Sequence, residues 1–314
     1  MRKALIVGVN DYPGSPLQGC VNDAASIATL LETHGDGSPN FSVRLMTGPP
    51  TQLTRPILRG AIEDLFSGDS DMALLFFAGH GYVKSTGGYL VTVDAQKYDE
   101  GVSMDDILKL ANDSQARNKV IMLDCCHSGA MASPALSSNS LAQLSEGLSV
   151  LTASRASESA LEKNGSGVFT SLLCDALQGG ASDLRGNITP GSLYAYVDEA
   201  LGAWDQRPIF KTNVTSFAAL RKINPKVPLE TLRRITQYFV SPDAEHILDP
   251  SYEDTEPSAD PAKVKIFKEL QKFQSVGLVV PVDAEFMYFA AVNSKSCRLT
   301  ALGYQYWRLV SEKK

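Results

Sequence analysis

The feature that most constrains the fold of this chain is a series of five short runs of β-branched and aliphatic residues. They lie at residues 4–9, 41–46, 72–77, 120–123 and 148–152. Their apolar character is continuous rather than alternating, which is typical of strands buried on both faces of a parallel sheet. Stretches with helical periodicity fill the gaps, at residues 20–33, 55–66, 104–110, 168–177 and 192–201. This alternation predicts an α/β/α sandwich with a mostly parallel sheet and a functional face at the carboxyl ends of the strands.

The chain is long enough for two domains, and its composition changes after about residue 222. From residue 241 to 260 there are seven acidic residues, three prolines and no Lys or Arg, which predicts a solvated linker or long loop. We therefore expect an α/β domain at 1–222 and a second domain at 223–314 that contains an acidic, Pro-rich loop at 241–261.

The second domain has the pattern of a small α+β module. Helices are expected at 262–273 and 300–310, strands at 278–282 and 286–292, and a leading helix at 226–239. Helix, two-stranded wing and helix in this order resemble a winged-helix module. Residues 225–314 carry twelve Lys or Arg and twelve Asp or Glu. DNA-binding modules usually show a basic face, so this balance favours protein docking or regulation over DNA binding.

Charge and cysteine usage bound the partners and the compartment. The net charge is −6 and the pI is about 5.3, which gives no general attraction to nucleic acid or anionic membranes. The five cysteines form no repeated CxxC spacing, so neither a disulfide framework nor a zinc site is indicated. No apolar run approaches the ~18 residues of a membrane span, and the N-terminal apolar run is too short for a signal peptide. We expect a cytoplasmic protein.

Two segments carry the chemistry, and each follows a predicted buried strand. One is Gly79-His80-Gly81, and the other is residues 124–129, DCCHSG. Small residues there allow the chain to turn sharply and bring backbone amides close to a ligand. Because the carboxyl ends of parallel strands share one edge, both segments are expected at the same site.

The residue types at these two strand ends are those of a cysteine protease. Such an enzyme needs a thiol activated by an imidazole and backbone N–H groups that stabilise the oxyanion. His80 and Cys126 can supply the pair, and the N–H groups of Gly81 and Cys126 are the natural oxyanion-hole donors. His127 follows the cysteine directly and would point away from it, so it is a poor candidate for the base.

Taken together, GHG, DCCHSG and the segment LQGCVNDA at residues 17–24 resemble a caspase-like cysteine peptidase of the metacaspase and bacterial orthocaspase branch. His80 precedes Cys126 by 46 residues, close to the ~50 of caspase-type enzymes. The resemblance extends over residues 1–222, including LTASRASESALE, GVFTSLLCDAL and the QRP at 206–208. It implies a catalytic dyad of His80 and Cys126, with Cys125 as a structural neighbour.

The same resemblance implies a specificity. Metacaspases cleave after Arg or Lys through acidic residues of the primary pocket, and Asp23 and Asp124 occupy the matching places, with Cys20 on the pocket wall by analogy. Two carboxylates near one pocket repel each other unless a cation joins them, so a basic side chain is the complementary ligand. Arg155 is the nearby residue that could oppose this preference. The alternative roles are a helix cap for Asp23 and a turn cap for Asp124.

No cofactor is expected, with calcium as the alternative. Asp105 and Asp106 occupy the place of an acidic pair that many metacaspases use for calcium, although a further acidic position of that family is Ser133 here. The pair also fits a helix N-terminus, which favours carboxylates. The Cys125-Cys126-His127 cluster lacks the partners of a tetrahedral zinc site.

Three functions follow from these patterns. The first is a cysteine endopeptidase that cleaves proteins after Arg or Lys. The segment at 130–150 contains no Lys or Arg, so such an enzyme has no self-processing site there, and Lys163 is the nearest candidate. We expect a single chain regulated through its C-terminal domain or a partner. The second is a silent scaffold of the same fold, and the third is a winged-helix regulator with an α/β sensor domain.

Overall fold

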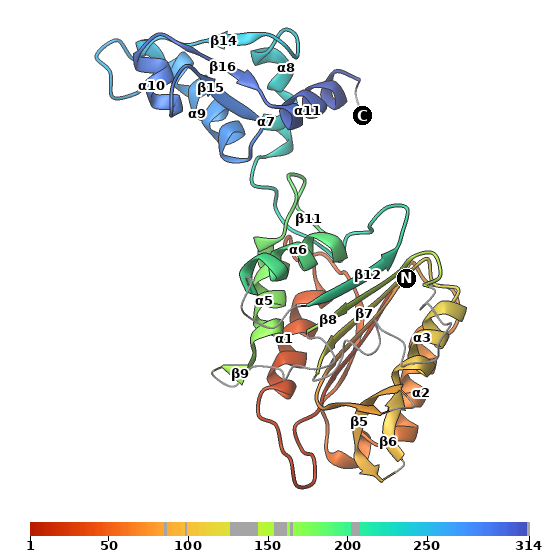
Figure 1. Ribbon diagram of the computed structural model, residues 1–314. Helices are drawn as coiled ribbons and strands as arrows, with labels where there is room; N and C mark the ends of the chain where they lie inside the picture. Colours follow the sequence, from red (N-terminus) through yellow and green to blue (C-terminus); the bar gives the residue numbers. More distant parts are fainter. Residues whose placement is uncertain are drawn as a thin grey trace. The chain divides into compact units, whose positions relative to one another are not determined.

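The computed structural model describes residues 1–84, 87–97, 99–125, 144–153, 162–163, 166–201 and 208–312. The chain forms two compact units (Figure 1). Unit 1 comprises Met1–Asp183 and Asn187–Ile223, and unit 2 comprises Leu184–Gly186 and Asn224–Lys314. Within the described ranges, no helix combines the length and the apolar character required to cross a membrane.

The centre of unit 1 is a six-stranded sheet with the strand order β12-β8-β7-β3-β1-β2. Its strands are β1 (Arg2–Gly8), β2 (Ser42–Met46), β3 (Met72–Ala78), β7 (Asn118–Asp124), β8 (Leu148–Thr152) and β12 (Ile209–Asn213). All pairs are parallel except β8 with β12. The five strands expected from the apolar runs are confirmed, and the antiparallel edge strand β12 was not expected.

The prediction that the strands are buried on both faces is confirmed for the inner strands but is wrong for β2. Every residue of β3 is buried, whereas Ser42, Arg44 and Leu45 of β2 are exposed. The reason is position, because β2 pairs with β1 only and forms the other edge of the sheet. An edge strand is shielded from water less completely than a central one.

Helices cover both faces of the sheet (Figure 1). One face carries α1 (Cys20–Glu32), α5 (Val168–Asp175) and α6 (Pro190–Leu201), and the other carries α2 (Arg55–Phe66) and α3 (Met104–Asp113). Each face of the sheet has its own apolar core, and successive residues of β3 point into alternate cores. Phe76 packs into the core on the α1 side, and Phe77 packs into the core on the α2 side. All five expected helices are present, so the α/β sandwich predicted from the sequence is the observed fold.

A small antiparallel sheet follows β3 directly. It consists of β4 (Gly81–Lys84), β5 (Gly87–Gln96) and β6 (Asp99–Ser103), in the order β4-β5-β6. It packs against α2 and α3 (Figure 1). Unit 1 also contains the short elements η1 (Pro50–Gln52), η2 (Ala176–Gly180), β9 (Glu162–Lys163) with β10 (Ser166–Gly167), and β11 (Asn187–Ile188) with β13 (Arg221–Lys222).

Unit 2 is an α+β module around its own apolar core. Its elements are α7 (Leu229–Arg233), α8 (Ile235–Tyr238), β14 (Glu245–Ile247), η3 (Pro250–Tyr252), α9 (Pro261–Ser275), β15 (Val279–Val282), α10 (Met287–Val292), β16 (Ser296–Leu299) and α11 (Ala301–Ser311). The three strands form an antiparallel sheet in the order β14-β16-β15.

Two expectations for this unit need correction. The segment expected as a strand at 286–292 is the helix α10, because the buried residues Met287, Ala290 and Ala291 recur at helical spacing. The acidic segment 241–260 is not an open linker, since it supplies β14 and η3 and buries Leu248 and Tyr252 in the core. Its charges are partly neutralised by lysines of α9.

The start of α1 lies against β1, and this contact requires a glycine. A Cβ at Gly8 would lie 2.3 Å from the carbonyl oxygen of Cys20 and 2.7 Å from the Cβ of Ala24. Both atoms belong to α1, and one of them is backbone, so the helix itself would have to shift. The last residue of β1 thus controls how closely α1 approaches the carboxyl edge of the sheet.

We predict that Gly8→Ala lowers the free energy of unfolding of unit 1 by about 1–3 kcal/mol, the usual cost of overpacking a well-packed core. The matched control is Gly60→Ala in α2, where an added Cβ meets no atom within 4 Å. There the same change should stabilise the helix by about 0.5–1 kcal/mol. Urea unfolding of the two variants measures both effects, and equal unfolding midpoints would contradict the close approach of α1.

Candidate active site

The two predicted site segments follow neighbouring strands of the sheet. β3 and β7 are parallel, and their last residues, Ala78 and Asp124, face each other in register. The N–H of Gly79 donates to the carbonyl oxygen of Asp124 at 3.2 Å, which continues the ladder by one residue. His80 follows Ala78 by two residues. In the sequence Cys126 follows Asp124 by two residues as well, and it lies outside the described residues, as do His127, Ser133 and Arg155.

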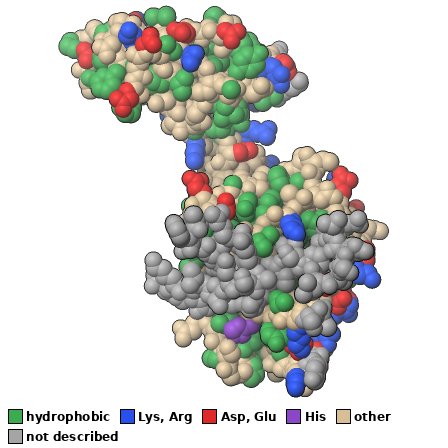
Figure 2. Space-filling view, viewed as in Figure 1, with side chains coloured by type: hydrophobic (Ala, Val, Ile, Leu, Met, Phe, Trp, Pro, Cys, Tyr) green, Lys and Arg blue, Asp and Glu red, His purple; other side chains and the backbone are tan. Residues whose placement is uncertain are grey.

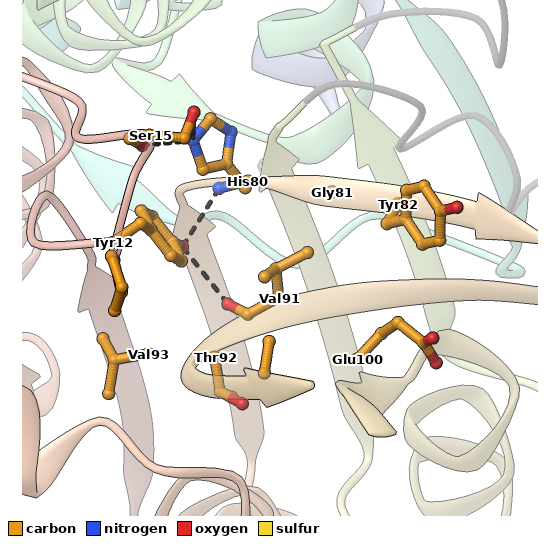
Figure 3. A pocket seen from close by; sticks show the side chains of 11 residues that line it. Tyr12, Ser15, His80, Gly81, Tyr82, Val91, Thr92, Val93 and Glu100 are labelled. Carbon is orange, nitrogen blue, oxygen red and sulfur yellow. Dashed lines mark hydrogen bonds between the residues drawn. The ribbon is translucent and has the colours of Figure 1, made fainter. Parts of the chain in front are cut away.

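A buried tyrosine fixes the backbone of His80 (Figure 3). The Tyr12 hydroxyl accepts a hydrogen bond from the N–H of His80 at 3.0 Å and donates one to the carbonyl oxygen of Val91 at 3.2 Å. The two rings are 4.5 Å apart between centroids. Burial raises the pKa of Tyr12 well above its usual range, so the hydroxyl keeps its proton and can serve both partners. A Cβ at Gly79 would lie 2.4 Å from that hydroxyl, which explains the first glycine of the GHG segment.

The imidazole of His80 is oriented by the loop that follows β1. Its Nε2 lies 2.8 Å from the carbonyl oxygen of Ser15 and 3.2 Å from the Ser15 hydroxyl (Figure 3). A carbonyl oxygen can only accept, so we assign the proton of the neutral ring to Nε2. Nδ1 is then the unprotonated nitrogen, which makes it the atom able to act as a base.

The two predicted pocket carboxylates lie together at the start of α5. Asp23 and Asp124 are 3% and 7% exposed. Oδ2 of Asp23 accepts from the N–H of Gly167 at 3.0 Å, and Oδ2 of Asp124 accepts from the hydroxyl of Thr170 at 2.6 Å. A Cβ on Gly167 would lie 3.2 Å and 2.5 Å from these same two oxygens, so the carboxylates flank one point.

These contacts bear on the capping roles considered for the two aspartates. Asp23 lies in the first turn of α1, yet α1 has no side-chain cap, and the described hydrogen bond of Asp23 goes to the first residue before α5. Both carboxylates therefore face the amino end of α5, where the helix dipole favours negative charge. Two buried carboxyl groups thus lie at one helix end.

The remaining cysteines of the described region are buried or half-buried and unsuited to nucleophilic attack. Cys20 and Cys125 are 6% and 1% exposed. Burial raises the pKa of Cys174 to about 12, with Asp23 and Asp175 adding to the effect, and burial raises that of Cys297 to about 12 with a contribution from Glu245. Thiols of such high pKa stay protonated near neutral pH.

Asp105 and Asp106 lie in the first turn of α3, and both are exposed. The Ser103 hydroxyl caps this helix by accepting from the N–H of Asp106 at 3.4 Å. Nowhere in the described part of the chain do three or more His, Cys, Asp or Glu side chains gather in a way that could hold a metal ion. The observed position of the pair is that of acidic residues at a helix N-terminus.

A cavity of about 340 Å³ opens beside His80 (Figure 3). Its walls come from four places: the loop after β1 with Tyr12, Pro13 and Ser15, residues 80–82, β5 with residues 91–93 and 95, and Glu100 of β6. Sequence reasoning missed Tyr12, Ser15 and this cavity. The loop after β1 has a turn-rich sequence, NDYPGSP, at a strand end of the same sheet edge, and that was the available signal.

The chain has the architecture of α/β cysteine peptidases. This class is indicated by the sheet order, by the histidine at the end of β3 and by the cysteine that follows β7 in the sequence. The caspase domain family matches the chain over residues 1–218, and the chain belongs to this family. The family implies the hydrolase activity of a cysteine peptidase. Among curated proteins, none matches the sequence significantly.

Two solved structures show the likeness in fold. A Geobacter sulfurreducens protein, GSU0716, has 18% sequence identity and a TM-score of 0.53, covering 71% of this chain and 97% of its own. Caspase-1 from Spodoptera frugiperda has 13% identity and a TM-score of 0.50, covering 71% of this chain and 90% of its own. These structures support the caspase-like sandwich of unit 1.

We predict that Tyr12→Phe lowers the free energy of unfolding by about 1–2 kcal/mol, because the buried N–H of His80 loses its acceptor. Amide hydrogen exchange at His80 should speed up by about tenfold or more in the variant. Tyr194→Phe is the control, since no described residue hydrogen-bonds the Tyr194 hydroxyl, and it should change neither quantity. Unchanged exchange at His80 in Tyr12→Phe would contradict the anchoring role of the tyrosine.

Proposed function

We propose that this protein is a cysteine endopeptidase of the metacaspase type that cleaves proteins after Arg or Lys with Cys126 and His80. The observation that carries the proposal is the imidazole of His80. It is held through Nε2 by the Ser15 carbonyl at the carboxyl end of β3, beside the strand that leads into Cys126. General-base activation of a thiol requires an imidazole held in one tautomer, and His80 is held in this way beside the strand after which Cys126 follows in the sequence.

In the proposed mechanism, Nδ1 of His80 takes the thiol proton of Cys126, and the sulfur attacks the scissile carbonyl carbon. The N–H groups of Gly81 and Cys126 donate to the oxyanion. The C–N bond then breaks as the imidazolium returns its proton to the leaving amine, which leaves a thioester. A water that gives a proton to His80 attacks the thioester, and the Cys126 thiol is released. This chemistry needs no metal, and calcium dependence would be a regulatory property.

The proposed specificity rests on Asp23 and Asp124. Their carboxylates converge at the start of α5, and both are buried. A guanidinium or ammonium group between them would relieve their repulsion and make charge-assisted hydrogen bonds. We place the side chain that precedes the scissile bond in this pocket, with Cys20 behind its wall. Acidic side chains are excluded by the same charges.

We propose that unit 2 regulates the peptidase or docks a protein partner, and that the enzyme acts as a single chain in the cytoplasm. The unit has helices, a three-stranded sheet and a final helix, as a winged-helix module does. The strands β15 and β16 would form the wing, and they are joined by the helix α10 instead of a turn. Acidic, basic and apolar side chains are mixed on the visible face of this unit (Figure 2). Such a mixture supports protein docking rather than DNA or membrane binding.

We predict that the purified protein cleaves fluorogenic peptides ending in Arg or Lys but not those ending in Asp. Cys126→Ala and His80→Ala should each lower kcat/KM by about 10³-fold or more, because the nucleophile or its base is lost. Cys125→Ala is the matched control and should keep most of the activity. Assays with calcium and with a chelator separate catalysis from calcium regulation.

Full activity of Cys126→Ala would rule out the assigned nucleophile. Absence of cleavage with any peptide would favour the silent scaffold of the same fold. Salt-dependent binding of the full chain to duplex DNA would instead favour the regulator with a sensor domain.

We predict that Asp23→Asn and Asp124→Asn each lower the preference for Arg over citrulline before the scissile bond by about 10- to 100-fold. Citrulline has nearly the shape of Arg without its charge, so the ratio of the two kcat/KM values is insensitive to a general loss of folded enzyme. Asp105→Asn removes an exposed carboxylate outside the pocket and should leave the ratio unchanged. An unaltered ratio in both pocket variants would disprove the assigned specificity.

A further inference from the structure

The cavity beside His80 has no part in the proposed mechanism, and neither Asp23 nor Asp124 lines it. We propose that it binds the side chain that follows the scissile bond, and that it selects a medium-sized or large apolar residue such as Leu, Met or Phe. This inference rests on the proposed peptidase function and adds a second specificity site to it.

The position of the cavity indicates which part of a substrate it would hold. The carboxylates lie on the side of the sheet covered by α1 and α5, whereas β5, which forms one cavity wall, packs against α2 and α3. His80 lines the cavity, and it follows the end of β3, which is in register with the end of β7 where Asp124 lies. The imidazolium must return its proton to the leaving amine, so the residue carrying that amine comes next to His80. A substrate with its basic side chain at the carboxylates therefore places its following residue at the cavity.

The chemistry of the walls indicates an apolar occupant. Val91, Val93, Pro13 and the ring of Tyr12 form much of the lining. The carboxylate on the wall, Glu100, is paired with Lys84, and its side chain is only 14% exposed. Glu100 therefore offers little attraction to a basic side chain, and an acidic one would lose its hydration against the apolar walls. Apolar walls with a few polar groups are the usual composition of ligand pockets.

The size and rigidity of the cavity also suit a single side chain. Its volume of about 340 Å³ is at the lower end of the ~300–1,000 Å³ of pockets for small molecules. The Tyr12 wall is fixed by hydrogen bonds at its hydroxyl to His80 and Val91. A wall that is already in place loses little conformational entropy on binding, which favours selection by shape.

The test uses internally quenched peptides that are identical except for the residue after a central Arg, which is Leu, Phe, Gly, Glu or Lys. For the wild-type protein, kcat/KM should be about tenfold higher with Leu or Phe than with Gly, and lowest with Glu. Ala95→Trp, an exposed rim position that lines the cavity, should reduce the Leu-to-Gly ratio to near one. Gln96→Trp places the same bulk on the next residue, which is exposed and does not line the cavity, and should keep the ratio.

The possible outcomes separate the two proposals. Cleavage after Arg at the same rate for every following residue would overturn the inference and leave the peptidase proposal standing. A Leu-to-Gly ratio that Ala95→Trp leaves intact would overturn the assignment to this cavity. Tyr82→Ala, which removes a half-exposed wall residue, provides a second variant and should lower the ratio as well. No cleavage after Arg in any peptide would overturn both proposals.

Discussion

The parallel register of β3 and β7 is the constraint on which the rest of the site depends. Because Ala78 and Asp124 face each other, the chain leaves two neighbouring strands at the same height. Strands in a sheet lie about 4.8 Å apart, so the residues that follow them start within reach of one another. The register is fixed in turn by burial, since a slip by one residue would move Phe76 and Phe77 each into the opposite core. The two packed cores thus determine which residues can meet at the edge.

Most of the fold could be predicted from the sequence, including the strand ends that the two motif segments follow. The five apolar runs and the five amphipathic stretches carry their own periodicity, and the small residues at 79–81 and 124–129 identify the strand ends. The antiparallel sheet β4-β5-β6 was missed, because Gly81–Lys84 and Asp99–Ser103 are too short and polar to show an apolar run. The segment at 286–292 shows the reverse error, since its six consecutive apolar residues from Met287 fit a strand and a buried helix equally.

The parts of the site that the sequence did not reveal are contacts made through space by main-chain atoms or by residues far apart in sequence. The partner of the His80 imidazole is a backbone carbonyl, Ser15 O, and any residue type could provide it. Thr170 lies 46 residues after Asp124, and only the packing of α5 against α1 brings it close. Single-residue motifs identify the groups that react, while the groups that orient them depend on the tertiary structure.

The two sides of the sheet therefore have different chemical characters at the edge where the strands end. On the α1 and α5 side, two buried carboxyl groups converge at the start of α5. On the side of β5, an apolar cavity begins at the ring of Tyr12 and has its one carboxylate neutralised by a lysine. His80 lines this cavity, with its backbone N–H held by Tyr12 and its ring held by Ser15. Under the proposed function, a peptide bond presented to that histidine with a cation on one side and an apolar residue on the other would satisfy both surfaces at once, and discrimination would then come from both sides of the bond that is cut.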